Sequence, residues 1–281
     1  MGDPMIGGRI PGKSSADPMA VGAKKNAEVV LETVELTKTF GGLTAVDTLD
    51  LRVHRGEISS LIGPNGAGKT TVFNVVTGIY RPESGIVLFQ SQNITGKKPH
   101  RIVERGIART FQNIRLFPNL TCMENVMAGR HARTRGGLGA ALFRPTWQVT
   151  EEKETRRLAE ERLSQVGLWE WRHELARNIA YGRQRMLEIA RALATSPRLV
   201  VLDEPSSGLN PSETAELMEF IKRIIREERL TGLLFEHDMN VVMGISDWVT
   251  VMDGGRKIAE GHPRQVYHDP QVIEAYLGGG A

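Results

Sequence analysis

The sequence predicts an α/β fold on the basis of three observations. Short apolar runs rich in β-branched residues alternate with stretches of helical period along the 281 residues. One of these runs leads into a glycine-rich stretch that precedes a helical pattern, and another ends in two acidic residues. Since 40% of the residues are hydrophobic and 25% are charged, the composition is that of a globular protein. We expect one compact unit with a subdomain.

The ends and the overall composition exclude several classes of protein. Residues 1–28 are rich in Gly, Pro, Ser and Lys without hydrophobic period, which predicts a flexible tail that lacks a secretory h-region. No apolar run approaches the ~20 residues that cross a bilayer. Cys122 is the only cysteine, which excludes a disulfide framework, and we expect it to be a partly buried hydrophobe. The formal charge of +3 does not indicate a nucleic-acid partner, and we expect a cytoplasmic chain.

A β-rich region opens the predicted domain, which covers residues 29–278. The predicted strands are Val29–Leu36, Leu49–Val53, Glu57–Ile62 and Gly85–Phe89, with a helix at Thr70–Thr77. Another predicted strand, Ile107–Phe111, ends at Gln112. We assign 29–112 to the core of the domain.

Residues 113–196 predict an α-helical subdomain. Its clearest helical signal is Glu151–Val166, and the Gly-rich, basic stretch 130–147 predicts a surface insertion. Downstream, residues 197–278 return to an alternating order and complete the core. The predicted elements there are the strand Leu199–Leu202, the helix Ser212–Glu228, and the strands Leu233–Glu236 and Trp248–Met252.

The glycine-rich stretch matches the phosphate-loop pattern G-x-x-x-x-G-K-[ST]. Its residues are Gly63, Pro64, Asn65, Gly66, Ala67, Gly68, Lys69 and Thr70, with Thr71 next in the helix. The glycines allow successive N–H groups to face phosphates, next to the positive end of the helix dipole. Lys69 is predicted to reach the β- and γ-phosphates of ATP, and the Thr70 hydroxyl to bind Mg²⁺. The alternative is a glycine-rich turn, and several NTPase classes share this loop.

Two carboxylates end the buried strand at 199–202. Strand ends at this edge of an open α/β sheet are where such folds place their ligands. We expect Asp203 to hold Mg²⁺ through water and Glu204, which faces differently, to act as general base on the attacking water. A solvated loop is the alternative for an isolated acidic pair.

Residues 179–193 resemble the signature motif and helix of ATP-binding cassette (ABC) proteins. The stretch begins Ile179-Ala180-Tyr181-Gly182-Arg183-Gln184-Arg185. The other elements of the resemblance follow in order: the phosphate loop, Gln112, Asp203 and Glu204, the turn Gly208-Leu209-Asn210, and His237. It covers about residues 29–277 and implies a P-loop NTPase cassette with a RecA-like mixed-sheet core, an antiparallel β subdomain and an α-helical subdomain.

The resemblance also implies a shared catalytic site. In this family two cassettes sandwich two ATP molecules, each between one subunit's phosphate loop and the other's signature. Gln112 would join the Mg²⁺ shell, and His237 would contact the γ-phosphate and orient the water of Glu204. Phe40 matches the aromatic residue that stacks on adenine, and Val46 is assigned to the same nucleotide site. The alternatives are that Gln112 only ends a strand, His237 is a loop histidine and Phe40 is a core residue.

The signature departs from the family pattern. Ala180 replaces the serine that gives the partner's γ-phosphate a hydroxyl, Tyr181 replaces glycine and Arg183 replaces glutamine. A lost hydrogen bond to a charged group is worth about 1.5–3 kcal/mol. We therefore expect a weaker partner site unless the Gly182 N–H and the helix dipole suffice. Asn210 replaces the usual aspartate in the turn.

Further stretches resemble the branched-chain amino acid importer branch of the family. They are Arg109–Phe117, Gly208–Pro211, Glu236–Met239 and Val272–Gly278. In that branch two different cassette subunits dock on two membrane permeases at the cytoplasmic face of the inner membrane, fed by a periplasmic amino-acid-binding protein. The insertion at 130–147 implies the larger cassette subunit. A cassette for urea or lipopolysaccharide export, and a soluble cassette of DNA maintenance or the ribosome, remain the alternatives.

Overall fold

The computed structural model describes residues 28–130 and 146–277. The strands are β1 (Val29–Phe40), β2 (Leu43–His54), β3 (Ile58–Ile62), β4 (Ser84–Phe89), β5 (Gln92–Asn93), β6 (Ile107–Arg109), β7 (Leu199–Asp203), β8 (Thr231–Phe235), β9 (Trp248–Asp253) and β10 (Arg256–Gly261). The helices are α1 (Lys69–Val76), α2 (Pro99–Arg105), α3 (Cys122–Arg130), α5 (Thr146–Gln165), α6 (Tyr181–Leu193), α7 (Pro211–Glu227), α8 (Met239–Ile245), α9 (Pro263–Tyr267) and α10 (Pro270–Leu277), with 3-10 turns η2 (Trp169–Trp171) and η3 (Ala176–Asn178).

A mixed six-stranded sheet forms the centre of the molecule. Its order is β10-β9-β3-β8-β7-β6, in which β10 is antiparallel to β9 and the other pairs are parallel. Every residue of β3 and β8 is buried, as is typical of parallel strands covered on both faces. This sheet confirms the predicted α/β core.

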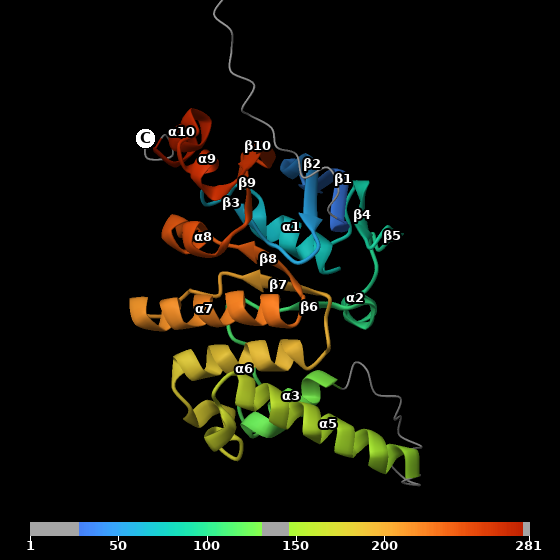
Figure 1. Ribbon diagram of the computed structural model, residues 1–281. Helices are drawn as coiled ribbons and strands as arrows, with labels where there is room; N and C mark the ends of the chain where they lie inside the picture. The colour runs from blue at the N-terminus through green and yellow to red at the C-terminus, as the bar shows by residue number, and fades with distance from the viewer. Residues whose placement is uncertain (1–27, 131–145, 278–281) are drawn as a thin grey trace, which may run out of the picture.

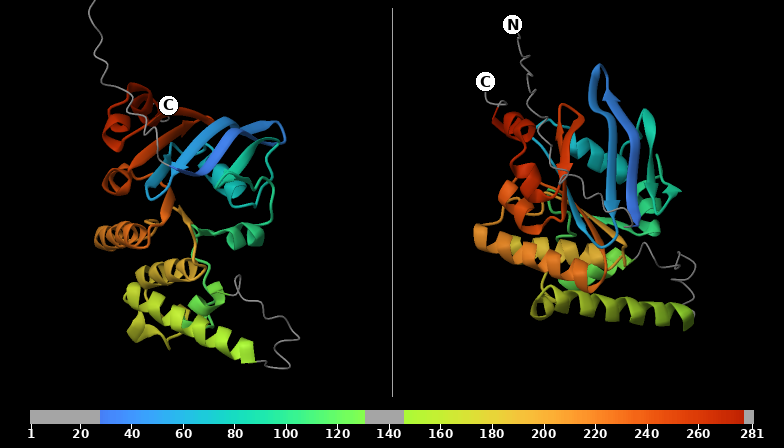
Figure 2. Two further views of the ribbon diagram at one scale, coloured as in Figure 1. Left: turned by 45° about the vertical axis from the view of Figure 1, so that its right-hand side comes forward. Right: turned by 45° about the horizontal axis from the view of Figure 1, so that its top comes forward.

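The two faces of the mixed sheet pack against different partners. Leu199 and Val201 of β7 join a core with α1 and the first two strands, whereas Val200 and Leu202 join a core with α7 and the α-helical subdomain. This alternation follows from the two-residue period of a strand. Figure 1 and Figure 2 show α1 between the two sheets and α7 next to the α-helical layer.

A second, antiparallel sheet has the order β2-β1-β4-β5. β1 pairs with both β2 and β4, and three shifts of register occur between 33 and 39 in its pairing with β2. It confirms the antiparallel part of the predicted fold. β2 is longer than the predicted strand at 49–53, because it begins at Leu43 directly after the turn that follows β1.

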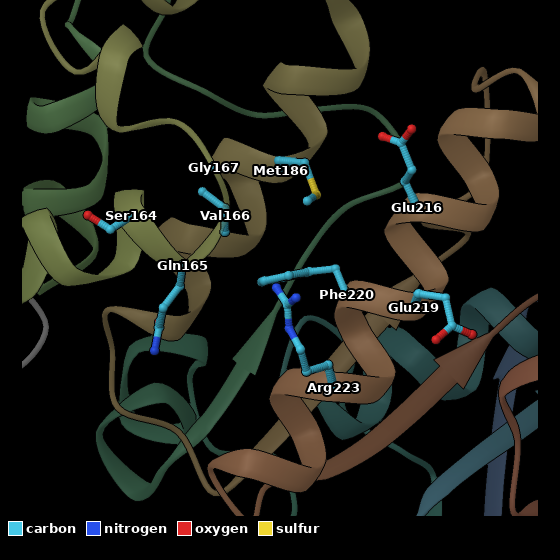
Figure 3. Close-up of a pocket in the computed structure, with 9 residues that line it drawn as sticks. All are labelled: Ser164, Gln165, Val166, Gly167, Met186, Glu216, Glu219, Phe220 and Arg223. Carbon is cyan, nitrogen blue, oxygen red and sulfur yellow. The ribbon is translucent and has the colours of Figure 1, made fainter.

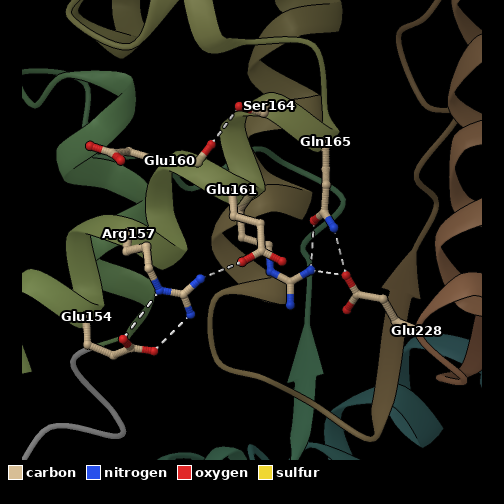
Figure 4. Close-up of polar contacts among 8 residues, drawn as sticks. Glu154, Arg157, Glu160, Glu161, Ser164, Gln165 and Glu228 are labelled. Carbon is tan, nitrogen blue, oxygen red and sulfur yellow. Dashed lines mark hydrogen bonds and ion pairs between the residues drawn. The ribbon is translucent and has the colours of Figure 1, made fainter.

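The α-helical subdomain consists of α3, α5, α6 and the turns η2 and η3. Cys122 at the start of α3 is fully buried rather than partly buried, and burial raises the pKa of its thiol to about 11. The exposed side of α5 carries ion pairs of Arg157 with Glu154 and Glu161 (Figure 4). At the end of α5, the buried Arg162 contacts Glu228 beyond α7, which ties this subdomain to the core.

Several elements differ in extent from the predicted ones. Glu28 was assigned to the tail, but it forms an ion pair with Arg55 at 2.7 Å; residues 1–27 lie outside the described residues. The predicted insertion 130–147 is helical at both ends, because Arg130 ends α3 and Thr146 begins α5, and 131–145 are not described. The strand at 107–111 ends at Arg109. No helix among the described residues is long and apolar enough to cross a membrane.

Candidate nucleotide-binding site

The loop between β3 and α1 has the backbone geometry that its glycines predict. Gly66 and Gly68 have φ of +85° and +98°, a region that disfavours residues with a Cβ. A Cβ at Gly63 would lie 2.0 Å from the carbonyl oxygen of Met252, and one at Gly68 would lie 2.3 Å from that of Ala45. Side chains are therefore excluded at both positions, and α1 begins at Lys69 directly after the loop.

Lys69 lies against this loop, with its side chain largely buried. Its Nζ donates hydrogen bonds to the carbonyl oxygens of Gly63 at 2.7 Å and Pro64 at 2.8 Å. A lysine ammonium has three donors, so these two bonds leave one for a phosphate oxygen. Burial lowers the pKa of Lys69, and the nearby charges of Glu204 and Asp203 oppose that shift.

Asp203 and Glu204 lie at the carboxyl end of β7, next to the end of β8. Burial raises the pKa of Asp203 to about 6, and repulsion from Glu204 and Glu236 adds to the shift. Glu204 has φ of +42°, which is uncommon for a residue with a side chain. Its N–H donates to the carbonyl of Phe235 at 2.9 Å, so β8 holds this strained residue in place.

The structure brings Gln112 and His237 to Glu204 from separate parts of the chain. Gln112 Nε2 donates to Glu204 Oε2 at 2.8 Å, and His237 Nδ1 lies 3.5 Å from Glu204 Oε1. Each oxygen of the carboxylate thus faces one of the two predicted partners. Gln112 and His237 are exposed, so a ligand can reach the group that they form.

Glu236 is a residue of the site to which the sequence analysis gave no role. It is fully buried, and its carboxylate accepts hydrogen bonds from Ser206 Oγ at 2.6 Å and from the backbone N–H groups of Ser206 and His237, both at 3.2 Å. It therefore fixes the loop after Glu204 and the backbone of His237 together. The sequence does contain a signal for Glu236, which is an acid directly after an apolar run. A carboxylate buried at such a place needs hydrogen-bond donors around it.

The two residues assigned to the adenine side differ in accessibility. Phe40 is 42% exposed and packs edge-on against Tyr80, with a centroid distance of 5.2 Å. One face of such a ring can accept an adenine. Val46 is 0% exposed within the core of the antiparallel sheet, so its side chain presents no surface to a nucleotide. Its apolar side chain points into the core, and its assignment to the nucleotide site stays a prediction.

The signature lies at the start of α6. Ala180 is the N-cap residue and its side chain makes no capping bond, while the Ala180 carbonyl accepts from Gln184 N–H at 2.9 Å. Tyr181 Oη donates to the carbonyl of Ser207 at 3.2 Å. In Figure 1 and Figure 2, α6 lies in the α-helical layer, and β7 and α7 lie between it and α1. The helix that carries the signature therefore lies in a different layer from the helix that follows the phosphate loop.

A cavity of about 490 Å³ lies between the end of α5, α6 and α7. Its lining residues are Ser164, Gln165, Val166, Gly167, Met186, Glu216, Glu219, Phe220 and Arg223, and none of them is a predicted site residue. Figure 3 shows the side chains of Met186, Phe220 and Arg223 around this space. The cavity lies between the α-helical subdomain and α7, away from the phosphate loop.

The predicted Mg²⁺ ligands fit a hard cation. Among the described residues, no three Asp, Glu, His or Cys side chains form a metal-holding group by themselves. The predicted set is instead a hydroxyl of Thr70, an amide of Gln112 and the carboxylate of Asp203, all of which offer the oxygen ligands that Mg²⁺ takes. Burial and the nearby charges of Glu204 and Glu236 raise the pKa of Asp203, and a cation held at this carboxylate would offset both effects.

Asp203→Asn is expected to stabilise the metal-free protein. Because the pKa of Asp203 is raised from 3.8 to about 6, the folded state binds its proton more tightly than the unfolded state. The free energy of unfolding therefore falls as pH rises from about 4 to about 6. We expect the variant to gain about 3 kcal/mol at pH 8 and about half of that at pH 5. Urea unfolding in EDTA measures both, and an equal gain at the two pH values would contradict the prediction.

Comparisons with known proteins agree with this geometry. The family model described as "ABC transporter" matches residues 46–207, and that described as "Branched-chain amino acid ATP-binding cassette transporter" matches residues 256–281. The chain is 44% identical to the high-affinity branched-chain amino acid transport ATP-binding protein BraF of Pseudomonas aeruginosa, over 89% of this chain and 98% of that one. It is also 44% identical to LivG of Escherichia coli, over 90% and 99%.

A solved structure has the same fold. It is an ATP-binding cassette of an ABC transporter in its ADP conformation, with 31% sequence identity, coverage of 89% of this chain and 99% of that one, and a TM-score of 0.78.

Proposed function

Because this chain belongs to the ABC transporter family, we propose that it is the ATP-hydrolysing subunit that powers a membrane importer of branched-chain amino acids. The carrying observation is the group formed by Gln112, Glu204 and His237 next to the phosphate loop, within a chain that is 44% identical to two cassettes of such transporters. The match of residues 256–281 to a family model of that branch supports the same substrate class.

ATP would be held by the loop and by one aromatic ring. Backbone N–H groups within 65–71 and the Lys69 ammonium would bind the phosphates, and the exposed Phe40 ring would stack on adenine. Thr70, Gln112 and Asp203 would hold Mg²⁺, which when bound neutralises charge on the phosphates. The close packing at Gly63 and Gly68 and the bonds of Lys69 within the loop support this arrangement, since the loop is preformed.

Glu204 would act as the general base. One of its carboxylate oxygens accepts a proton from the attacking water, whose oxygen then bonds to the γ-phosphorus as the bond to ADP breaks. Gln112 and His237 approach the two oxygens of this carboxylate, which fixes its orientation. A positioned base contributes about 10²–10⁴ in rate.

A second cassette subunit would complete each ATP site. The separation of α6 from α1 within this chain supports this requirement, because its own signature does not reach its own phosphate loop. The backbone N–H of Gly182 and the start of α6 would face the partner's ATP, without a hydroxyl at Ala180. We propose a different cassette as the partner, as in the importer branch that the chain resembles.

The cassette pair would bind two membrane permeases at the cytoplasmic face of the inner membrane and would not contact the amino acid itself. A periplasmic binding protein would deliver the solute to the permeases. The cassette would then be a peripheral membrane protein, and no nucleic acid would take part.

Uptake of labelled leucine tests this proposal directly. Cells that lack this gene should lose high-affinity leucine uptake, the wild-type chain should restore it, and Glu204→Gln should not. Urea uptake serves as the control solute and should be unchanged. Normal leucine uptake with altered urea uptake would favour the other-solute alternative, and co-fractionation of the chain with ribosomes or DNA rather than membranes would contradict a transport function.

A further inference from the structure

We propose that Arg185, on the signature helix α6, is a positioning residue that holds Gln112 against the general base Glu204. The inference rests on the proposed function, because it concerns how the hydrolytic site is assembled. Arg185 is 0% exposed, although it carries a guanidinium and lies four residues after the exposed Tyr181. A buried charge of this kind needs several partners, and all of its described partners belong to the catalytic segments or to α6.

The guanidinium of Arg185 binds the backbone that carries Gln112. Nη1 donates to the carbonyl of Phe111 at 2.7 Å, and Nη2 donates to the carbonyl of Gln112 itself at 2.8 Å. Since Gln112 lies outside any helix or strand, no regular ladder fixes its main chain. The two hydrogen bonds from α6 therefore fix the main chain at Gln112, in place of the hydrogen bonds that a strand or helix would provide.

Glu188 completes this clamp one turn further along α6. Its Oε2 accepts from Arg185 Nη1 at 3.0 Å, and its Oε1 accepts from the N–H groups of Phe111 and Arg115, both at 3.4 Å. One buried ion pair thus binds carbonyls and amides of the same segment. Any rigid displacement of α6 must carry residues 111–115 with it or break these bonds.

Tyr181 links the same guanidinium to the loop after Glu204. Arg185 Nη2 donates to Tyr181 Oη at 3.3 Å, and Tyr181 Oη donates to the carbonyl of Ser207 at 3.2 Å. Gly208 lies so close that a Cβ there would be 3.0 Å from the tyrosine ring. The contacts close a ring that runs from Gln112 to Glu204, along the chain to Ser207, and back through Tyr181 and Arg185.

This ring of contacts would couple the signature to the catalytic base of its own subunit. In the proposed function, the start of α6 contacts the ATP held by the partner cassette. Because Arg185 and Tyr181 tie that start to both ends of the Gln112–Glu204 hydrogen bond, occupancy of the partner's site would set the geometry of the base in this one. The departure from the family pattern at Tyr181 then supplies a hydroxyl that glycine cannot provide.

A double-mutant cycle in the purified transporter complex tests the inference. Gln112→Ala and Arg185→Met are each expected to lower kcat for ATP by about tenfold, with KM changed by less than about twofold. If Arg185 acts through Gln112, the double variant should be no slower than Gln112→Ala alone, since residues that act as a unit are not additive. Tyr181→Phe, which removes one hydroxyl, should lower kcat about two- to fivefold and should also be silent in the Gln112→Ala background.

Arg162→Met is the matched control. Arg162 is also a buried arginine of the α-helical subdomain, but its partners are Gln165 of α5 and Glu228 just after α7. The fold-change in kcat caused by Arg162→Met should multiply with that caused by Gln112→Ala, because the two residues act independently.

Multiplicative effects of both Arg185→Met and Tyr181→Phe with Gln112→Ala would overturn the inference and leave the proposed function intact. If Arg185→Met does not fold, the Tyr181→Phe cycle alone decides. Unchanged turnover in Gln112→Ala would instead overturn the proposed role of Gln112, and the inference with it.

Discussion

Glu204→Gln is expected to lower ATP turnover by at least ~10² while ATP binding is retained. Glutamine has nearly the same shape, and its amide oxygen can still accept the hydrogen bond that Gln112 Nε2 donates to Glu204 at 2.8 Å. The amide cannot take a proton from water, so the step that needs a base is lost. The phosphate loop and the start of α1, which would bind the nucleotide, are unaffected by the change.

Two measurements separate binding from hydrolysis for this variant. Phosphate release at saturating ATP in the purified complex gives kcat, and calorimetry on the full chain gives the ATP affinity, which should change by less than about twofold. Glu260→Gln is the matched control, since Glu260 is an exposed carboxylate paired with Lys257 on β10. Unchanged turnover in Glu204→Gln would exclude the base role, and a parallel loss of ATP affinity would show that the carboxylate is structural.

Local patterns predicted the phosphate loop well. The loop depends on short-range features, namely the apolar strand before it, the glycines within it and the helix after it. The structure places Gly63, Gly66 and Gly68 at positions that disfavour side chains. Each of these constraints acts between residues that are close in the sequence, so the loop can be predicted from one sequence alone.

The assembly of the site could not be derived from the sequence in the same way. Gln112, Glu204 and His237 are far apart along the chain, and only the family resemblance placed them together. The buried contacts of Arg185 and Glu188 were also unpredicted, because α6 reads as an ordinary helix with charged residues. The segment packed against a helix, here 111–115, decides which of its charged side chains are buried. The periodicity of the helix sequence does not specify that segment.

The direction of the Val46 side chain could not be derived from the sequence for the same reason. A strand residue near the phosphate loop can point to the nucleotide or into the core, and a shift of one residue reverses the two faces. β1 and β2 contain register shifts on both sides of this region. Alternation along β2 therefore does not specify which way Val46 points, and the structure places its side chain in the core.

Lys69→Ala is expected to weaken ATP binding itself by about 10²-fold. A charge-assisted hydrogen bond contributes about 1.5–3 kcal/mol, which corresponds to roughly 10- to 150-fold in affinity. The change also removes the bonds from Nζ to the carbonyls of Gly63 and Pro64, so the loop loses two of its internal contacts. Calorimetry with ATP on the full chain gives the affinity, and thermal unfolding shows whether the fold is retained.

Lys222→Ala provides the matched control for this loss. The Lys222 ammonium also donates to a backbone carbonyl, that of Gly244 at 3.1 Å, but it lies on the exposed side of α7. Its ATP affinity should equal that of the wild-type chain, because the lost bond is remote from the phosphate loop. Equal affinity in Lys69→Ala would contradict the phosphate-loop assignment. If Lys69→Ala loses ATP affinity but keeps the wild-type kcat at saturating ATP, Lys69 acts in binding alone. If kcat at saturating ATP is also low, Lys69 stabilises the transferring phosphoryl group as well.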